Sequence, residues 1–183
     1  MPLRDDDELL LTGGMFQVVR RVTVAADGRR HVREIIRHPG AVVLLPLLDD
    51  GRVVLIRNRR EAVQQHLIEL PAGTLEPGED PLAAAHRELA EETGYRAGSM
   101  EILVSFFSSP GILDERMQLY LAGGLAPGPM DLQAGEEIEP IAVPWEEALR
   151  MARDGRIIDA KTLIGLLFYE SFRGRPAGRA TSG

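Results

Sequence analysis

The segment from Gly73 to Gly94 constrains the fold of this chain more than any other stretch, because it contains a clearly signalled helix. Asp80 is a favourable N-cap residue, and Pro81 suits the first helical position. Apolar residues then recur at helical spacing, and Gly94 can adopt the left-handed conformation that ends a helix. The sequence therefore predicts a helix that begins at Pro81, ends before Gly94 and buries one face.

Carboxylates crowd the same predicted helix. Glu88 and Glu92 lie one turn apart with Glu91 beside them, and like charges at this spacing destabilise a helix by about 0.2–0.5 kcal/mol per pair. A divalent cation would neutralise them, and Mg²⁺ binds through carboxylates together with substrate phosphates. The alternative is a solvated acidic face, the usual fate of a charge run. The flanking glycines and Arg87, which can pair with Glu91, favour metal-assisted phosphate chemistry.

Composition limits the other possibilities. A length of 183 residues suits one domain, and 44% hydrophobic residues suffice for a core. The net charge of −7 argues against a nucleic-acid partner, which needs a basic surface. The sequence has no cysteine and no apolar run long enough for a bilayer. Its acidic N-terminus lacks a signal peptide pattern, so we expect a cytoplasmic protein without a membrane partner.

Periodicity and turn signals predict an α/β fold. Residues 1–12 are acidic and are expected to be poorly ordered at their start. A turn at 26–28 joins two strands into an antiparallel hairpin. The predicted strands are 16–24, 30–37, 41–48, 52–57, 68–70, 102–107, 117–123 and 138–143, and two further helices are predicted at 145–153 and 160–172. Strands on both sides of the acidic helix indicate a layered α/β/α sandwich with a mixed sheet, plus the N-terminal hairpin.

The glycine, arginine and acid spacing resembles the Nudix box of Nudix hydrolases. The matching positions are Gly73, Glu79, Arg87, Glu88, Leu89, Glu91, Glu92 and Gly94. Tyr95 departs from the pattern, because an aliphatic residue is usual there. The resemblance implies a Nudix-type fold and three regions: a strand hairpin at 1–38 that forms a dimer contact, a Nudix hydrolase domain at 39–173, and a mobile tail at 174–183.

The resemblance also implies a metal site with two or three Mg²⁺ or Mn²⁺ ions. Glu88 and Glu92 match the helix ligands, Glu91 matches a third or bridging ligand, and the carbonyl of Ala72 matches a backbone ligand. Pro110 stands sixteen positions after Gly94, which looks like the ADP-ribose pyrophosphatase branch, although Ser-Pro-Gly is also an ordinary turn sequence. The implied reaction is hydrolysis of ADP-ribose to AMP and ribose 5-phosphate.

Substrate contacts are implied in the same way. Arg60 matches a phosphate-binding position, since a guanidinium grips phosphate oxygens in a fork, and the alternative is a solvated basic edge. The other predicted substrate residues are Arg57, Glu69, Pro110, Gly111, Arg116 and Phe16. Phe16 is placed for stacking on adenine, with a core role as the alternative. In related enzymes the N-terminal hairpin crosses to the other subunit, so a homodimer is implied.

The general base is expected in an acidic loop after the helix. Aligned on Ile138, Glu136 matches the family's loop glutamate and also a metal ligand, with Glu137 as the second candidate and Glu91 as a further catalytic acid. A solvated acidic turn is the alternative for Glu136. Two other functions stay open: hydrolysis of another nucleoside diphosphate derivative, such as a sugar nucleotide or NADH, and a sensor that binds ADP-ribose without cleaving it.

Overall fold

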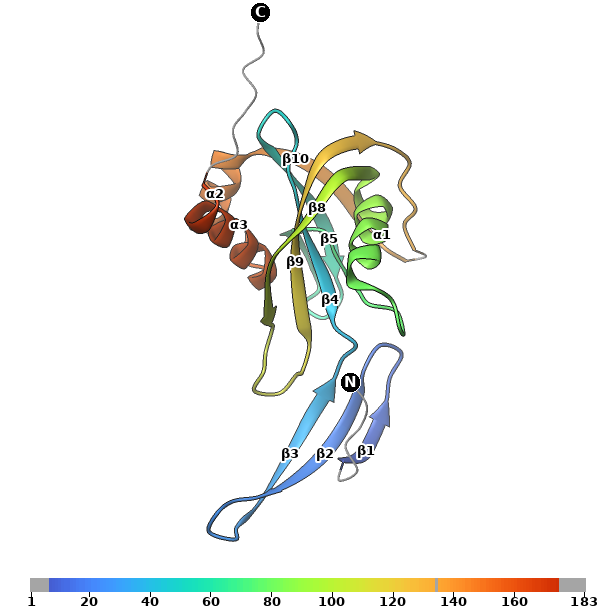
Figure 1. Ribbon diagram of the computed structural model, residues 1–183, viewed down its shortest axis with the longest axis vertical. Helices are drawn as coiled ribbons and strands as arrows, with labels where there is room; N and C mark the ends of the chain where they lie inside the picture. Colours follow the sequence, from blue (N-terminus) through green and yellow to red (C-terminus); the bar gives the residue numbers. More distant parts are fainter. Residues whose placement is uncertain (1–6, 134, 175–183) are drawn as a thin grey trace, which may run out of the picture.

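The computed structural model describes residues 7–133 and 135–174. The predicted tail at 174–183 therefore lies outside the described residues beyond Gly174. The chain forms a layered α/β body with a separate antiparallel sheet extending from one end (Figure 1). This arrangement confirms the predicted α/β/α class with a mixed sheet and an N-terminal antiparallel element.

Within residues 7–133, the N-terminal sheet has three strands. β1 (Asp7–Thr12), β2 (Gln17–Val24) and β3 (Arg30–Arg37) pair in that order, all antiparallel. β2 and β3 are the predicted hairpin, but β1 was not predicted. Its acidic start is ordered because Asp7 stands opposite Arg21 and accepts two hydrogen bonds from that guanidinium, at 2.6 and 2.8 Å.

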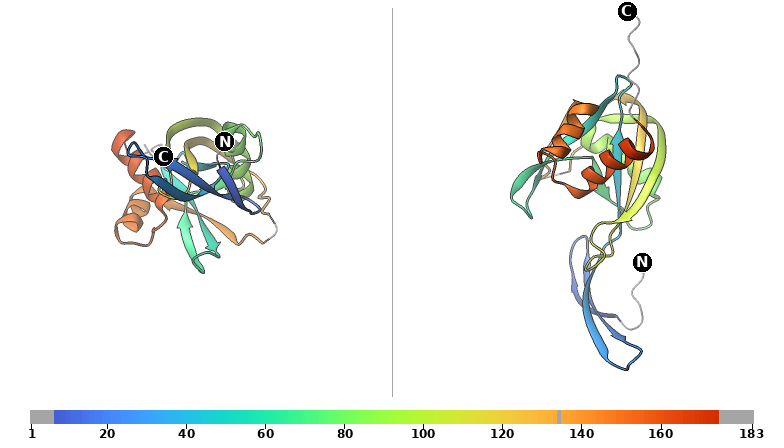
Figure 2. Two further views of the ribbon diagram at one scale, coloured as in Figure 1. Left: turned by 90° about the horizontal axis from the view of Figure 1, so that it is seen from below. Right: turned by 90° about the vertical axis from the view of Figure 1, so that its left-hand side faces the viewer.

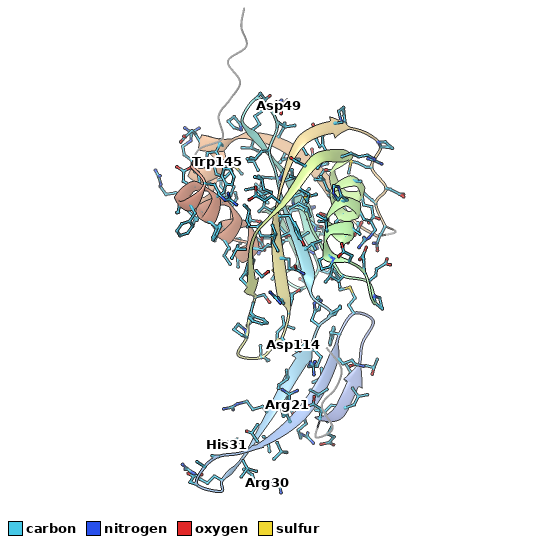
Figure 3. The ribbon with its side chains drawn as sticks, viewed as in Figure 1. Arg21, Arg30, His31, Asp49, Asp114 and Trp145 are labelled. Carbon is cyan, nitrogen blue, oxygen red and sulfur yellow. The ribbon has the colours of Figure 1, made fainter. Side chains whose placement is uncertain are left out.

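A short junction joins this sheet to the main body. Asp114, which lies in the β8–β9 connection, accepts hydrogen bonds from Arg37 and from the backbone N–H of His38, and the Ile36 N–H donates to the Ile112 carbonyl at 2.8 Å. Figure 3 places Asp114 between the main body and the strands that carry Arg21. The strand that leaves the N-terminal sheet therefore enters the body at a fixed position.

In the part of the chain that the structure describes, the body contains two sheets. One has the order β10-β5-β6 and the other β7-β4-β9-β8, with β4 and β9 parallel and the remaining pairs antiparallel. Their strands are β4 (Ala41–Pro46), β5 (Arg52–Arg60), β6 (Gln65–Glu69), β7 (Ala72–Thr74), β8 (Tyr95–Phe107), β9 (Arg116–Pro127) and β10 (Ile138–Pro144). Helix α1 (Pro81–Thr93) covers one side, and α2 (Trp145–Arg153) and α3 (Ala160–Phe172) cover the other (Figures 1 and 2).

Alternation along the buried strand β4 divides the core between these two sides. Val43 and Leu45 face the cluster that includes Trp145, while Val42 and Leu44 face the cluster that includes Leu89 of α1. Successive strand residues point to opposite faces, so a strand covered on both sides must be apolar throughout. The run at 41–48 has this character, and β4 thus positions α1 relative to α2 and α3.

Several strand predictions needed correction, including that for 68–70, where β6 begins at Gln65 and ends at Glu69. β7 was not predicted, β8 and β9 are longer than the strands expected at 102–107 and 117–123, and β5 continues through Arg60 instead of ending near Arg57. Each extension depends on a distant partner: Tyr95 pairs with Pro127, and Arg60 pairs with Gln65. Within the part of the chain that the structure describes, no helix is long and apolar enough to cross a membrane.

Candidate active site

A cleft of about 870 Å³ lies where the N-terminal sheet meets the body. Its walls come from six parts of the chain: the β1–β2 connection, the β3–β4 junction, strand β5, the strand β7 with its following loop, helix α1 and the loop before β10. Its lining residues include Phe16, Arg37, His38, Asn58, Arg60, Ala72, Gly73, Arg87, Glu88, Glu92, Gln133 and Glu136. The predicted acidic helix and the predicted acidic loop therefore face one space.

Helix α1 is held in place by its own termini. Asp80 Oδ1 accepts hydrogen bonds from the backbone N–H groups of Leu82 and Ala83, at 3.0 and 3.1 Å. At the other end Gly94 has φ 71°, in the left-handed region. Both ends match the sequence prediction. The helix consequently presents Glu88 and Glu92, one turn apart, at the edge of its buried face.

Glu88 and Glu92 are both buried, with 7% and 4% of their surface exposed. Burial raises the pKa of Glu92 to about 8, although the Ala72 N–H, which donates to its Oε2 at 2.9 Å, acts in the opposite direction. Burial likewise raises the pKa of Glu88, against the effect of Arg87. Buried carboxylates with raised pKa values are typical of functional sites.

Arg87 fixes the neighbouring acids. Its Nε and Nη2 donate to the two oxygens of Glu79 at 2.9 and 3.0 Å, while Nη1 donates to Glu88 at 2.7 Å and to Glu91 at 3.2 Å. Glu79 lies in the loop before α1. Arg87 therefore ties this loop to the helix and restrains two of the predicted metal ligands.

The donor set fits a hard divalent cation. All its side-chain donors are carboxylate oxygens, which Mg²⁺ and Mn²⁺ prefer. Gly73 leaves the room that the Glu88 carboxylate occupies, because a Cβ there would lie 1.8 Å from Glu88 Cδ. Among residues 7–133 and 135–174 no three acidic or imidazole side chains lie close enough together to hold a metal ion. Arg87 binds Glu88 and Glu91 through hydrogen bonds to its guanidinium. Glu88 and Glu92 are the residues that would hold the cation.

Arg60 enters the cleft from strand β5. Asn58 and Arg60 line it, whereas Arg57 and Arg59 do not, and Arg57 is exposed. This is the pattern that alternation along a strand requires. Arg60 Nε and Nη2 donate to the two oxygens of Glu69 at 2.8 and 2.6 Å. Glu69 has no exposed surface and does not line the cleft. Glu69 therefore lies outside the cleft lining and holds Arg60 through this pair of hydrogen bonds.

The predicted acidic loop reaches the cleft through one of its two candidates. Glu136 lines the cleft and contributes to the raised pKa values of Glu88 and Glu92. The Glu137 side chain is exposed and lies 3.8 Å from His66 Nε2. Of the two glutamates, only Glu136 is among the residues that line this cleft.

Most of the other predicted substrate residues lie outside the cleft. Pro110 and Gly111 line a second pocket of about 550 Å³ with Arg21, Arg33 and Phe107. Arg116 is exposed at the start of β9 and lines neither pocket, whereas Phe16 lines the cleft and is 40% exposed. The single chain does not bring Pro110, Gly111, Arg57 or Arg116 to the carboxylates of α1.

The buried polar residues near the cleft that sequence reasoning missed include Arg37, Asn58 and Lys161. Asn58 lines it directly, and Lys161 contacts Glu69. Lys161 is the only lysine among the 21 lysine and arginine residues of the chain. A single lysine among so many arginines was a usable signal of a specific role for that residue. Its burial indicates paired carboxylates, because lysine is rarely buried unless it is paired.

Comparison with known proteins identifies the family. The NUDIX domain model matches residues 36–164. A methanol dehydrogenase activator of Bacillus methanolicus is 40% identical over 146 residues, which cover 79% of each chain. An ADP-ribose pyrophosphatase of Bacillus subtilis is 33% identical over 165 residues, covering 89% of each. The chain belongs to the Nudix family, whose members generally use divalent metal ions.

A solved structure shows the same fold. The crystal structure of an ADP compounds hydrolase superposes with a TM-score of 0.80 and 23% identity, covering 93% of this chain and 95% of the other. The matched family region, residues 36–164, includes helix α1 and its carboxylates. The protein is a Nudix pyrophosphohydrolase.

Proposed function

We propose that this protein hydrolyses the diphosphate of ADP-ribose, giving AMP and ribose 5-phosphate. The observation that carries the proposal is the pair of buried carboxylates, Glu88 and Glu92, in a large cleft that also contains Arg60. The Bacillus subtilis relative, an ADP-ribose pyrophosphatase that matches 89% of each chain, supports the substrate.

Bound Mg²⁺ or Mn²⁺, two or three ions in the proposal, would neutralise the diphosphate and favour departure of the leaving phosphate. Glu88, Glu91, Glu92 and the Ala72 carbonyl would hold these ions. Arg60 would bind a phosphate through the guanidinium hydrogens that Glu69 does not use. These roles follow the family resemblance, and the cleft position of Arg60, Glu88 and Glu92 supports them.

Glu136 is the proposed general base. In the balanced reaction one water adds across the P–O–P bridge: its oxygen bonds to one phosphorus, a bridging P–O bond breaks, and Glu136 accepts the proton. The cleft position of Glu136 supports this role, and the exposed position of Glu137 makes it the second candidate.

The proposal includes a cytoplasmic homodimer. Apolar side chains of the N-terminal sheet are exposed in the single chain, among them Leu9, Leu11, Val24 and Val32, and exposed apolar patches mark interaction sites. A partner that covers this sheet would lie next to the cleft wall formed by Phe16. The sequence has no cysteine that would need an oxidising compartment.

A substrate panel tests the function directly. ADP-ribose, a sugar nucleotide and NADH are each incubated with Mg²⁺ or Mn²⁺, and the products are separated and identified. The proposal requires AMP and ribose 5-phosphate from ADP-ribose at the highest kcat/KM of the panel. Binding of ADP-ribose without products would indicate a sensor, and preference for another compound would change the substrate. The double variant Glu88→Gln, Glu92→Gln is the inactive control.

A further inference from the structure

The only lysine of the chain lies beside the active-site cleft. Lys161 is in the first turn of α3 and is 7% exposed. The other twenty cationic side chains are arginines. A lysine ammonium is a compact point charge, whereas a guanidinium is a planar fork, so a buried site with acceptors on two sides suits lysine.

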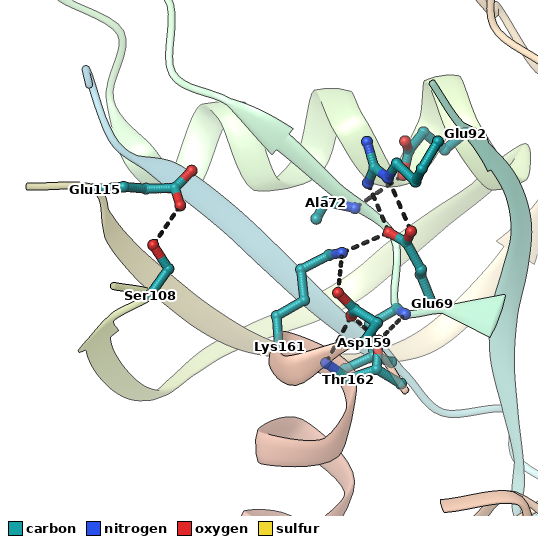
Figure 4. A network of polar contacts seen from close by, with 10 residues as sticks. Glu69, Ala72, Glu92, Ser108, Glu115, Asp159, Lys161 and Thr162 are labelled. Atoms are coloured by element: carbon teal, nitrogen blue, oxygen red, sulfur yellow. Dashed lines mark hydrogen bonds and ion pairs between the residues drawn. The ribbon is translucent and has the colours of Figure 1, made fainter. Parts of the chain in front are cut away.

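The Lys161 ammonium contacts two carboxylates. Its Nζ donates to Glu69 Oε2 at 2.5 Å and lies 3.1 Å from Asp159 Oδ1 (Figure 4). Glu69 Oε2 also accepts from Arg60 Nη2 at 2.6 Å. One oxygen of a fully buried carboxylate is thus shared between the lysine and the cleft arginine.

The contacts of Arg60 leave one edge of its guanidinium for a ligand. Glu69 takes Nε and Nη2, so Nη1 and the second Nη2 hydrogen remain available for phosphate oxygens. The Arg60 side chain is 41% exposed and lines the cleft. Glu69 therefore determines which way the free edge of Arg60 points.

Charge sharing gives Lys161 a further effect. If Glu69 paired with Arg60 alone, the carboxylate would neutralise the arginine and reduce its attraction for a diphosphate. Lys161 takes part of that negative charge, and Asp159 in turn partly balances Lys161. At the low effective dielectric of a buried cluster such pairs interact more strongly than in water.

We propose that Lys161 is a positioning residue for the diphosphate: it shares Glu69 with Arg60, which keeps the outer edge of the Arg60 guanidinium aimed into the cleft and its charge available to phosphate. This inference rests on the proposed function. It assigns Lys161 and Glu69 no contact with substrate, in contrast to the sequence-based prediction for Glu69.

A purely structural role for Lys161 is the rival explanation. However, α3 has a separate anchor to the body: Thr162 Oγ1 accepts from the Leu70 N–H at 2.7 Å and donates to Asp159 at 2.6 Å. Asp159 also caps the helix by accepting from the Thr162 N–H at 3.0 Å. These bonds do not involve Lys161, so we expect the variant Lys161→Met to fold.

Calorimetry with the non-hydrolysable analogue α,β-methylene ADP-ribose tests the inference, because it measures binding affinity without turnover. We expect Lys161→Met to weaken binding at least fivefold and to raise the KM for ADP-ribose by more than it lowers kcat. Asp159→Asn is the matched control, because it removes the carboxylate that partly balances Lys161 and keeps a capping side chain, and its affinity should fall by no more than twofold below wild type. In a double-mutant cycle, Lys161→Met and Glu69→Gln should be non-additive.

A second readout needs no variant of Lys161. A chain with ¹³C-labelled lysine gives one side-chain Cε signal, which should shift when the analogue binds to the wild type but not to Glu69→Gln. Any one of three results would overturn the inference. These are unchanged affinity in folded Lys161→Met, additive effects in the double-mutant cycle, and a Cε signal that does not shift when the analogue binds. A wild-type protein that neither binds the analogue nor cleaves ADP-ribose would instead refute the proposed function, and the inference with it.

Discussion

Replacing Gly73 by alanine should separate metal binding from stability. A Cβ at this position would lie 1.8 Å from Glu88 Cδ and 2.0 and 2.2 Å from its two oxygens. Ordinary contact begins at 3.4 Å, so Cδ must retreat by about 1.6 Å, the difference between 3.4 and 1.8 Å. Metal–ligand distances tolerate deviations of only about 0.2 Å. The variant should therefore remove Glu88 as a ligand.

The fold should tolerate the same change. The atoms that the new methyl group meets are the far end of a flexible side chain, and Gly73 is in a strand conformation open to alanine. Alanine also reduces the freedom of the unfolded chain, a gain of about 0.4–1 kcal/mol. We expect the free energy of unfolding to change by no more than about 1 kcal/mol, while Mn²⁺ affinity should fall by at least about 10–100-fold, the cost of losing an outer-shell partner of a metal ligand.

The assay combines Mn²⁺ calorimetry, ADP-ribose kinetics and urea denaturation of the metal-free protein. Gly123→Ala is the matched control. Gly123 lies on strand β9 and does not line the cleft, and a Cβ there would meet only Ser99 Oγ, at 3.1 Å. It should leave Mn²⁺ affinity and kcat/KM within twofold of wild type. If Gly73→Ala also kept both values within twofold, the position assigned to Glu88 in metal binding would be refuted.

Three further predictions concern individual carboxylates. Glu136→Gln should lower kcat by about 10²–10⁴, the usual contribution of a general base, and Glu137→Gln by far less; a drop below tenfold for Glu136→Gln in steady-state kinetics would exclude it as the base. Metal-free protein in a chelator should lose thermal stability as pH rises from about 4.5 to 8, because the pKa of Glu92 is about 8 when folded and near 4.5 when unfolded, so the folded state holds the proton more tightly. Glu92→Gln should flatten this decline, and a Tm that rises over the same range would contradict the assignment. Asp80→Ala should lower the free energy of unfolding by about 1 kcal/mol in urea titrations, since it removes the cap of α1; an unchanged value would contradict the capping role.

Local signals made the helices predictable. All three predicted helices are present with the predicted limits, and Asp159 is the N-cap of α3. Helical bonds join residues four apart, so a sequence window contains most of the information. Periodicity also placed Glu88 and Glu92 at the edge of the buried face of α1, and both are buried.

Strand limits and distant side-chain partners were not predictable in the same way. β7 exists because it pairs with β4, about thirty residues earlier, and its Ala-Gly-Thr sequence has no strand signal. The contact of Lys161 with Glu69 joins residues 92 positions apart. Such contacts depend on how α3 packs against the sheet, which no single segment encodes.

Because the only lysine is buried, its chemical modification can report local opening of the protein around α3. Since every other side-chain cation except histidine is a guanidinium, an amine-reactive ester added to the folded protein has no exposed lysine to modify. Acylation of Lys161 requires that α3 separate from the strand that carries Glu69. The rate of that modification would therefore measure how often this part of the molecule opens, without a spectroscopic probe being introduced.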